Sequence, residues 1–337
     1  MIDLTILIAS YETRELILSC LDSVEAARRA HPELAVEIIV VDNASSDGTV
    51  VAIREHFPEV RVFALVRNRG FAAAVNLGLR ASRGRSILLL NSDVEVDEDL
   101  LAGGARILDE NSQVGVVGAA LVHSDGRAQR SVHALPGLQT ELLPEFVLRS
   151  FRPAAFAPRG GAGSEAIRAG LREVEAIRGA VFFFRASLIE KIGALNEGFF
   201  FFMEETEYCA RVRQAGYLIL HAEALRAVHH LGASSKRVAA LATRIEYHRS
   251  LYRFLAIERG PSVARFARGL RTLRGGLLIL GMIVIFPISP SVRRRMAERW
   301  GLFLWHLQGC PDEPRLADVL EATRARASES GRKAIEA

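Results

Sequence analysis

Two acidic residues that follow strand-like runs are the first side chains in this sequence that could do chemistry. Asp42 follows the run 37–41, and Asp93 closely follows the run 87–90. A carboxylate at the end of a buried strand can accept hydrogen bonds from a nucleobase or from a ribose hydroxyl group. It can also hold Mg²⁺ or Mn²⁺, which bind one or two protein carboxylates together with substrate phosphates and waters. We predict a ligand-binding role for Asp42, and the pattern allows a metal-binding role for Asp93.

A second acidic group, Glu204, Glu205 and Glu207, comes shortly after the four phenylalanines at 199–202. Apolar surroundings raise the pKa of a carboxyl group, which suits a general base. The alternative is the acid-rich first turn of a helix, where carboxylates complement the helix dipole. The residues alone leave both interpretations open.

His229 and His230 follow another apolar stretch and precede Gly232. A neutral imidazole is a common metal ligand, and a charged one can bind phosphate. Either histidine could have such a role, and the alternative is a purely structural one.

The elements that must position these residues follow from the apolar pattern of the first 120 residues. Short apolar runs alternate with stretches that have apolar residues at helical spacing, which indicates βαβ units and a parallel sheet buried on both faces. The predicted strands are 4–9, 37–41, 60–66 and 86–90, and the predicted helices are 14–30, 50–57 and 72–81. Ligands bind at the carboxyl ends of the strands in such sheets.

The pattern is less regular in the middle of the chain. Residues 136–176 contain four prolines and predict a mobile loop or an insertion. A strand at 177–184, a helix at 186–192 and a strand at 217–221 are expected after it.

Composition excludes several classes of protein. Half of the 337 residues are apolar, which argues against a disordered chain and against a collagen-like repeat. Cys20, Cys209 and Cys310 are widely spaced and odd in number, so free thiols in a reducing compartment are expected. The N-terminus has no basic segment ahead of its apolar run, so a strand is expected there rather than a signal peptide. These features predict a cytoplasmic catalytic part.

Glycine-rich phosphate-binding motifs are missing, because neither G-x-G-x-x-G after the first strand nor G-x-x-x-x-G-K-[ST] occurs. If a nucleotide binds, we expect a metal and arginines to neutralise its diphosphate. The net charge of +4 gives no indication of a nucleic-acid partner.

The charge is unevenly distributed along the chain. Residues 236–337 contain 19 basic and 9 acidic side chains, whereas residues 1–235 contain 24 and 30. Four arginines between 265 and 274 precede an apolar run at 275–288, and three more follow at 293–295. The run is shorter than the roughly 20 residues that a membrane-spanning helix needs. It predicts an apolar hairpin or interfacial helix on an anionic membrane surface, with a buried core helix as the alternative.

Taken in order, several segments resemble the family 2 inverting glycosyltransferases, and in particular the bacterial rhamnosyltransferase-like branch that builds cell-surface polysaccharide. They include ILIASYETRELILSCLDSV, IIVVDNASSDGT, VRNRGFAAAVNLGLRASRG, ILLLNSDVEV and VHHLGASS, and the resemblance covers roughly residues 3–252. It implies a GT-A fold, which is a Rossmann-like α/β architecture with a mostly parallel central sheet flanked by helices. The catalytic domain would span residues 1–260, and residues 261–337 would form a basic and apolar helical tail that associates with the membrane.

The resemblance also implies which residues bind the donor. These are Ser10, Glu12, Asp42, Asn43, Asn68, Gly70, Asn76, Asn91, Ser92 and Asp93. Glu12 replaces the usual Asn, and Asn91 replaces the first Asp of the D-x-D-like metal motif. Asp93 would then bind Mg²⁺ or Mn²⁺ together with His229, or with His230 as the second choice.

The resemblance places Gly179 and Ala180 against the acceptor, or against the sugar of the donor. Glu204-Glu205 stands where the family has an E-D pair, so Glu205 occupies the position of the base and Glu204 lies beside it.

The implied activity is transfer of a sugar, preferably a rhamnose-like deoxyhexose, from a dTDP- or UDP-sugar. The acceptor would be a hydroxyl group of a cell-surface glycan or of a polyprenyl-diphosphate-linked glycan, reached from the cytoplasmic face of the plasma membrane. The changes at Glu12 and Glu205 suggest an alternative, which is a catalytically weak or inactive membrane-bound scaffold that binds sugar nucleotides. The missing glycine motif opposes a nicotinamide oxidoreductase.

Overall fold

The computed structural model describes residues 2–151, 170–230, 240–285 and 290–323. The chain divides into two compact units. The first combines Met1–Leu135, Leu143–Phe199 and Glu204–Ala233, and the second combines Pro136–Leu142, Phe200–Met203 and Ser234–Ala337.

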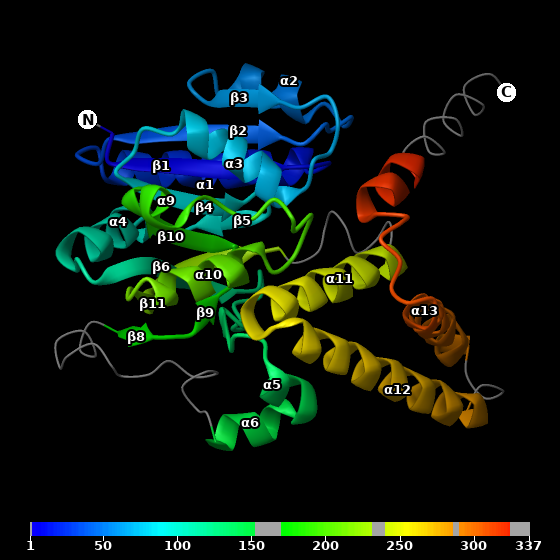
Figure 1. Cartoon of the computed structure of the whole chain (residues 1–337). Helices are drawn as coiled ribbons and strands as arrows, with labels where there is room; N and C mark the ends of the chain where they lie inside the picture. Colours follow the sequence, from blue (N-terminus) through cyan, green and yellow to red (C-terminus); the bar gives the residue numbers. More distant parts are fainter. Residues whose placement is uncertain (1, 152–169, 231–239, 286–289, 324–337) are drawn as a thin grey trace, which may run out of the picture. The chain divides into compact units, whose positions relative to one another are not determined.

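The first unit is built on one large mixed sheet (Figure 1). Within the described residues this sheet has nine strands, in the order β3-β2-β1-β4-β10-β6-β11-β5, and β8 also pairs with β11. The strands are β1 (Leu4–Ser10), β2 (Val36–Asp42), β3 (Arg61–Ala64), β4 (Ser86–Asn91), β5 (Val94–Val96), β6 (Val114–Val122), β8 (Leu171–Glu173), β10 (Val181–Arg185) and β11 (Leu218–His229). A separate ribbon pairs β7 (Val132–His133) with β9 (Ala176–Ile177).

Strand direction determines which ends of the strands meet. β3, β2, β1 and β4 are parallel, as the sequence predicts, and β11 is parallel to β6. β10 runs antiparallel to both of its neighbours, β4 and β6. Its apolar run carries no sequence signal of direction, since such a strand is buried on both faces in either orientation. The carboxyl ends of β1, β2, β4, β6 and β11 therefore share one edge of the sheet with the beginning of β10.

Helices cover both faces of this sheet and alternate strand residues pack against each layer. One core contains residues of α1 (Arg14–Ala30), α2 (Thr49–His56) and α4 (Leu100–Glu110), together with Ile6 and Ile8 of β1. The other contains residues of α3 (Phe71–Ala81), α9 (Ser187–Ile192) and α10 (Glu204–Gln214), together with Leu7. Burial of each Leu or Ile side chain contributes roughly 1.5–3 kcal/mol to the free energy of folding. The strands that are buried on both faces therefore supply much of the stability. The predicted two-sided burial is confirmed.

The middle of the chain is more regular than the sequence predicts. Part of 136–176 forms α5 (Leu138–Leu142), α6 (Glu145–Phe151), β8 and β9, while residues 152–169 lie outside the described residues. Pro144 precedes α6, and its carbonyl accepts hydrogen bonds from Val147 and Leu148. This proline starts a helix instead of interrupting one, since its fixed φ suits the first turn.

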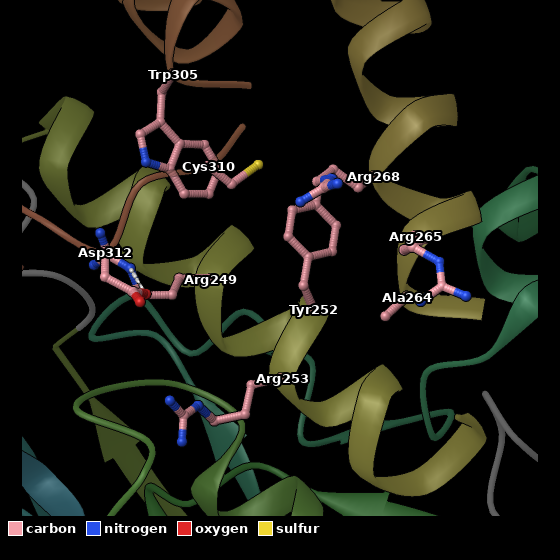
Figure 2. Close-up of a pocket in the computed structure, with 9 residues that line it drawn as sticks. All are labelled: Arg249, Tyr252, Arg253, Ala264, Arg265, Arg268, Trp305, Cys310 and Asp312. Carbon is pink, nitrogen blue, oxygen red and sulfur yellow. Dashed lines mark ion pairs between the residues drawn. The ribbon is translucent and has the colours of Figure 1, made fainter. Parts of the chain in front are cut away.

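The second unit contains α11 (Ala240–Arg259), α12 (Pro261–Ile285) and α13 (Pro290–Leu307), together with α5. Gly260, with φ +93°, separates α11 from α12, and Pro261 begins the next helix. This is the usual order of a glycine at a helix end and a proline at a helix start. No helix in the described ranges is both long and apolar enough to cross a bilayer. A cavity lined by α11, α12 and residues of the segment after them lies within this unit (Figure 2).

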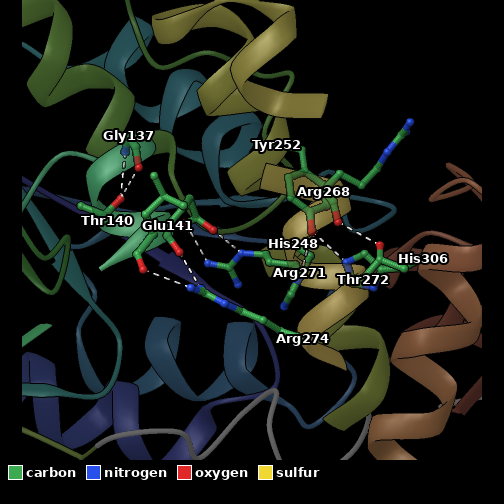
Figure 3. Close-up of polar contacts among 11 residues, drawn as sticks. Gly137, Thr140, Glu141, His248, Tyr252, Arg268, Arg271, Thr272, Arg274 and His306 are labelled. Atoms are coloured by element: carbon green, nitrogen blue, oxygen red, sulfur yellow. Dashed lines mark hydrogen bonds and ion pairs between the residues drawn. The ribbon is translucent and has the colours of Figure 1, made fainter. Parts of the chain in front are cut away.

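A buried ion pair joins α12 to α5 (Figure 3). Arg271 Nε and Nη2 lie 2.6 Å and 2.9 Å from the two carboxylate oxygens of Glu141. Arg274 donates hydrogen bonds to the backbone carbonyls of Glu141 and Leu142. Two of the four arginines that precede the apolar run therefore bind groups of α5.

Two histidines and a tyrosine link α11 to α13. Tyr252 Oη lies 2.7 Å from His306 Nε2 and 3.3 Å from His248 Nδ1 (Figure 3). Burial lowers the pKa of His248 to about 3, and Arg271 and His306 add to the effect. Burial also lowers the pKa of His306. Both histidines are thus neutral at neutral pH.

Candidate functional site

The sheet register brings the predicted polar residues to one edge. Ser10 pairs with Asp42 at the ends of β1 and β2, and Ala9 of β1 pairs with Asn91 at the end of β4. The Asn91 N–H donates a hydrogen bond to the carbonyl of Ala180, just before β10. Since β11 runs in the same direction as β4, its last residue, His229, lies at this edge too.

Asp42 offers a buried hydrogen-bond acceptor. Its Oδ1 accepts the Ser45 N–H at 2.9 Å, whereas its Oδ2 is buried and accepts no hydrogen bond from the described residues. Burial raises the pKa of this carboxyl group, although the hydrogen bonds from Ser45 oppose the shift. An unsatisfied buried oxygen costs about 1–3 kcal/mol, and an N–H or O–H group of a ligand would remove that cost.

Glu12 and Asn43 brace the loops beside Asp42. Glu12 Oε1 accepts hydrogen bonds from both the N–H and the hydroxyl of Ser46, at 2.8 Å and 2.9 Å. The Asn43 side chain accepts the Arg69 N–H and donates to the carbonyl of Gly70. Both residues hold the loops beside Asp42.

The segment around Asn68 is shaped by local hydrogen bonds. Asn68 Oδ1 accepts the Gly70 N–H at 2.9 Å, and Gly70 has φ +86°, which favours glycine. Asn76 is buried, and its amide exchanges hydrogen bonds with the N–H and the carbonyl of Leu195. These contacts shape the loop before α3 and hold the middle of α3 against Leu195.

A chain of hydroxyl groups connects Ser10 with Ser92, which directly precedes Asp93. Ser10 Oγ lies 3.2 Å from Thr13 Oγ1, which donates to Ser92 Oγ at 3.1 Å. Thr13 is missing from the sequence-based prediction because it stands directly before α1, where a threonine suggests only a helix cap.

Asp93 and His229 face each other, with Asp93 Oδ1 and His229 Nε2 3.4 Å apart. The other ring nitrogen of His229, Nδ1, lies 3.1 Å from Gln129 Oε1. The orientation of the Gln129 amide follows from its Nε2, which donates to the backbone carbonyls of Val122 and His229. Gln129 Oε1 therefore accepts a hydrogen bond from Nδ1–H. A neutral His229 then presents the lone pair of Nε2 to a carboxylate.

Two electron-pair donors that face each other fit a shared cation. Carboxylate and imidazole both bind Mn²⁺ and related ions, and a fixed second nitrogen is usual for a metal-binding histidine. Within the described ranges no three or more His, Cys, Asp and Glu side chains form a metal site, so Asp93 and His229 would be a partial ligand set. Phosphate oxygens and waters commonly complete such a set. His230 Nε2 instead lies 2.8 Å from Glu95 Oε1.

Glu205 lies in the first turn of α10 and packs against Gly179. A Cβ added to Gly179 would lie 3.3 Å from Glu205 Cγ, so glycine leaves room for the carboxylate. The backbone N–H groups of Gly179 and Thr206 stabilise the charged carboxylate, but its Oε2 is buried and makes no hydrogen bond within the described residues. Burial raises the pKa of Glu205 against these hydrogen bonds, as a general base requires.

The neighbours of Glu205 belong to the helix start. Glu204 is buried, and the Glu207 carboxylate pairs with Arg211 at 2.8 Å. His133, which the sequence pattern did not single out, has Nε2 3.1 Å from Thr206 Oγ1. Burial lowers the pKa of His133 to about 4, with help from Arg178 and Arg130. The acid-rich helix start and a reactive carboxylate are therefore compatible interpretations of this segment.

Known proteins are similar to this chain in sequence and in fold. A sequence model described as "Glycosyl transferase family 2" matches residues 5–174. The chain is 25% identical over 278 residues to the N-acetylglucosaminyl-diphospho-decaprenol L-rhamnosyltransferase of Mycobacterium tuberculosis, covering 78% of this chain and 88% of that protein. It is 36% identical over 151 residues to the succinoglycan biosynthesis protein ExoO of Rhizobium meliloti, covering 43% of this chain and only 42% of that relative's length.

Among solved structures, the mannosyltransferase PcManGT from Pyrobaculum calidifontis in complex with GDP-Man and Mn²⁺ is similar. The TM-score is 0.53 at 17% sequence identity, over 90% of this chain and 86% of that one. At this identity the likeness is one of fold, and it confirms the predicted GT-A architecture.

Proposed function

This chain belongs to glycosyl transferase family 2. From that premise we propose that the residues at this edge of its sheet transfer a sugar from a nucleoside-diphosphate sugar to an acceptor hydroxyl, with inversion of the anomeric centre. One observation carries the proposal. Along a single edge, the buried oxygens Asp42 Oδ2 and Glu205 Oε2 accept no hydrogen bond from the described residues, and Asp93 faces His229.

Each of these groups has a separate task. Asp42 accepts a hydrogen bond from the base or the ribose of the donor. Asp93 and His229 would hold Mg²⁺ or Mn²⁺, which when bound would supply positive charge that stabilises the leaving diphosphate. Glu205 accepts the proton of the acceptor hydroxyl. At the same time the oxygen of that hydroxyl bonds to the anomeric carbon of the donor, and the bond from this carbon to the diphosphate breaks. No covalent enzyme intermediate is needed, because a single displacement inverts the anomeric centre.

The relatives support a more specific substrate. The mycobacterial relative is named for transfer of L-rhamnose to N-acetylglucosaminyl-diphospho-decaprenol. We therefore favour a rhamnose-like deoxyhexose carried by dTDP or UDP, and a glycan acceptor linked to a polyprenyl diphosphate. The metal requirement is supported by the structural neighbour, which was solved with Mn²⁺.

Nucleotide titration tests the donor site. We expect one of dTDP, UDP and GDP to bind the purified chain in the presence of Mn²⁺, with affinity at least tenfold weaker after chelation, since the cation screens the diphosphate. Isothermal titration calorimetry measures both states. The absence of binding by all three nucleotides with Mn²⁺ would contradict the proposal.

A membrane surface is the proposed partner of the second unit. Phe266, Leu273, Leu277 and Leu280 of α12 are about half exposed or more, and their spacing places them on one stripe of the helix. Trp300, Leu304 and Leu307 repeat the same spacing on α13. Exposed apolar stripes of this kind insert into the headgroup region of a bilayer.

Removing the α12 stripe tests membrane binding. Changing Leu273, Leu277 and Leu280 together to serine should weaken co-sedimentation with vesicles of phosphatidylglycerol and phosphatidylcholine at least tenfold, because each leucine loses about 1 kcal/mol or more of apolar burial. The control is Val66→Ser, which changes an apolar side chain of the first unit that is 99% exposed. Equal sedimentation of the triple variant and the control would refute membrane binding through this stripe.

A further inference from the structure

The cavity of the second unit is lined by arginines from two helices (Figure 2). Arg249, Tyr252 and Arg253 of α11 face it together with Arg265 and Arg268 of α12, and the cavity measures about 360 Å³. That volume lies within the roughly 300–1,000 Å³ of small-molecule sites. None of these residues belongs to the sheet edge described above.

The positive charge of this cavity is only partly compensated. Arg249 pairs with Glu246 at 2.6 Å and lies 3.9 Å from the exposed Asp312. By contrast, Arg268 donates only to the Gly309 carbonyl and the Cys310 thiol, and Arg265 only to the Ser262 hydroxyl.

Arg253 makes no hydrogen bond or ion pair with any residue that the structure describes, and it is exposed. Together with Arg265 and Arg268, it leaves three guanidinium groups on the cavity wall that form no hydrogen bond or ion pair with a carboxylate in the described part of the chain, although the charge of Arg253 acts on Glu246. Arg249 adds a buried Nε that has no hydrogen-bond acceptor there. Several guanidinium groups around a cavity match a ligand with several negative oxygens, because the planar fork binds phosphate oxygens in pairs.

We propose that this cavity binds the diphosphate group of a lipid-linked acceptor. Arg265 and Arg268 lie on the same helix as the exposed stripe, and Arg265 directly precedes Phe266, which is 49% exposed. A lipid that lies along the stripe of α12 can place its head group at these arginines. The inference rests on the proposed function, since it names the part of the acceptor that this unit recognises.

Pyrophosphate is the first probe, used with the full chain in excess chelator so that metal-dependent binding at Asp93 does not contribute. We expect binding that weakens at least tenfold in the double variant Arg253→Gln, Arg265→Gln. The lysine pair Arg253→Lys, Arg265→Lys should bind with intermediate affinity, because the charges remain but the planar fork is lost. The matched control, Arg54→Gln with Arg80→Gln, removes two exposed charges from the first unit and should bind as the unchanged chain does.

Farnesyl diphosphate and phosphatidylglycerol vesicles then separate the possible sources of phosphate. We expect the chain to bind farnesyl diphosphate at least tenfold more tightly than pyrophosphate. In the triple serine variant of α12, the two affinities should become equal. Equal affinities in the unchanged chain would overturn the lipid-linked assignment. The double glutamine variant could instead bind vesicles more weakly and bind pyrophosphate as tightly as the unchanged chain does. That result would overturn the diphosphate site.

Failure of this inference differs from failure of the proposed function. If the sheet edge is not a donor site, nucleotide binding with Mn²⁺ is absent in every variant. If only the arginine cavity is misassigned, nucleotide binding with Mn²⁺ is retained and pyrophosphate binding in chelator is absent or insensitive to the glutamine pair. Thermal unfolding of each variant shows whether the fold is retained.

Discussion

Replacing Glu205 with glutamine is expected to lower kcat by about 10²–10⁴-fold while changing donor affinity by no more than about twofold, which is the usual scale of a lost general base. The substitution preserves the size of the side chain and its place against Gly179, but the amide cannot take up a proton. Release of free nucleoside diphosphate measures turnover, and calorimetry with the nucleotide measures binding.

The pH dependence of turnover provides a separate readout. Burial raises the pKa of Glu205 above the ordinary value of 4.5 for glutamate. The base works only when ionised, so kcat/KM should fall as the pH drops through this raised pKa, and the acidic limb of the profile should lie above pH 4.5. Glu205→Gln should abolish that limb.

Two further variants show whether the loss is specific. Glu204→Gln alters the neighbouring carboxylate, which is buried, and should reduce turnover less than Glu205→Gln. Glu190→Gln changes an exposed glutamate of α9 and should leave turnover unchanged. Full turnover by Glu205→Gln, with normal nucleotide binding, would show that Glu205 is not the base. Nucleotide binding without turnover by the unchanged chain would favour the alternative of a sugar-nucleotide-binding scaffold.

The sequence predicts the sheet edge well because its signals are local. Asp42 and Asn91 each end an apolar run, and the structure places them at the ends of β2 and β4. Parallel pairing in register then brings both ends together, as the strand–helix alternation implies.

What the sequence could not predict depends on contacts between distant polar residues. Gln129 fixes the tautomer of His229 from 100 residues away, and Arg271 pairs with Glu141 across 130 residues. Neither contact lies on a periodic apolar pattern, so no local signal identifies it. The same holds for β10, whose direction depends on the path of the chain before it and not on its own residues.

Replacing Asp93 with asparagine is expected to lower turnover by at least about 10³-fold and to weaken Mn²⁺-dependent nucleotide binding at least tenfold. The change removes the negative charge of one of two proposed ligands and leaves a neutral amide beside His229 Nε2, so several kcal/mol of charge stabilisation are lost. The concentration of free Mn²⁺, followed by electron paramagnetic resonance during titration, measures the metal site directly.

The two adjacent histidines provide a matched control for this site. His229→Gln should weaken Mn²⁺ binding about as much as Asp93→Asn does, since Nε2 of His229 lies 3.4 Å from Asp93 Oδ1. His230→Gln should leave Mn²⁺ binding unchanged, because His230 Nε2 lies 2.8 Å from Glu95 instead. Gln129→Leu should cost about 10–100-fold in metal affinity, because the lost acceptor frees the tautomer of His229. Equal Mn²⁺ binding by the His229 and His230 variants would show that the metal lies elsewhere, whatever happens to turnover.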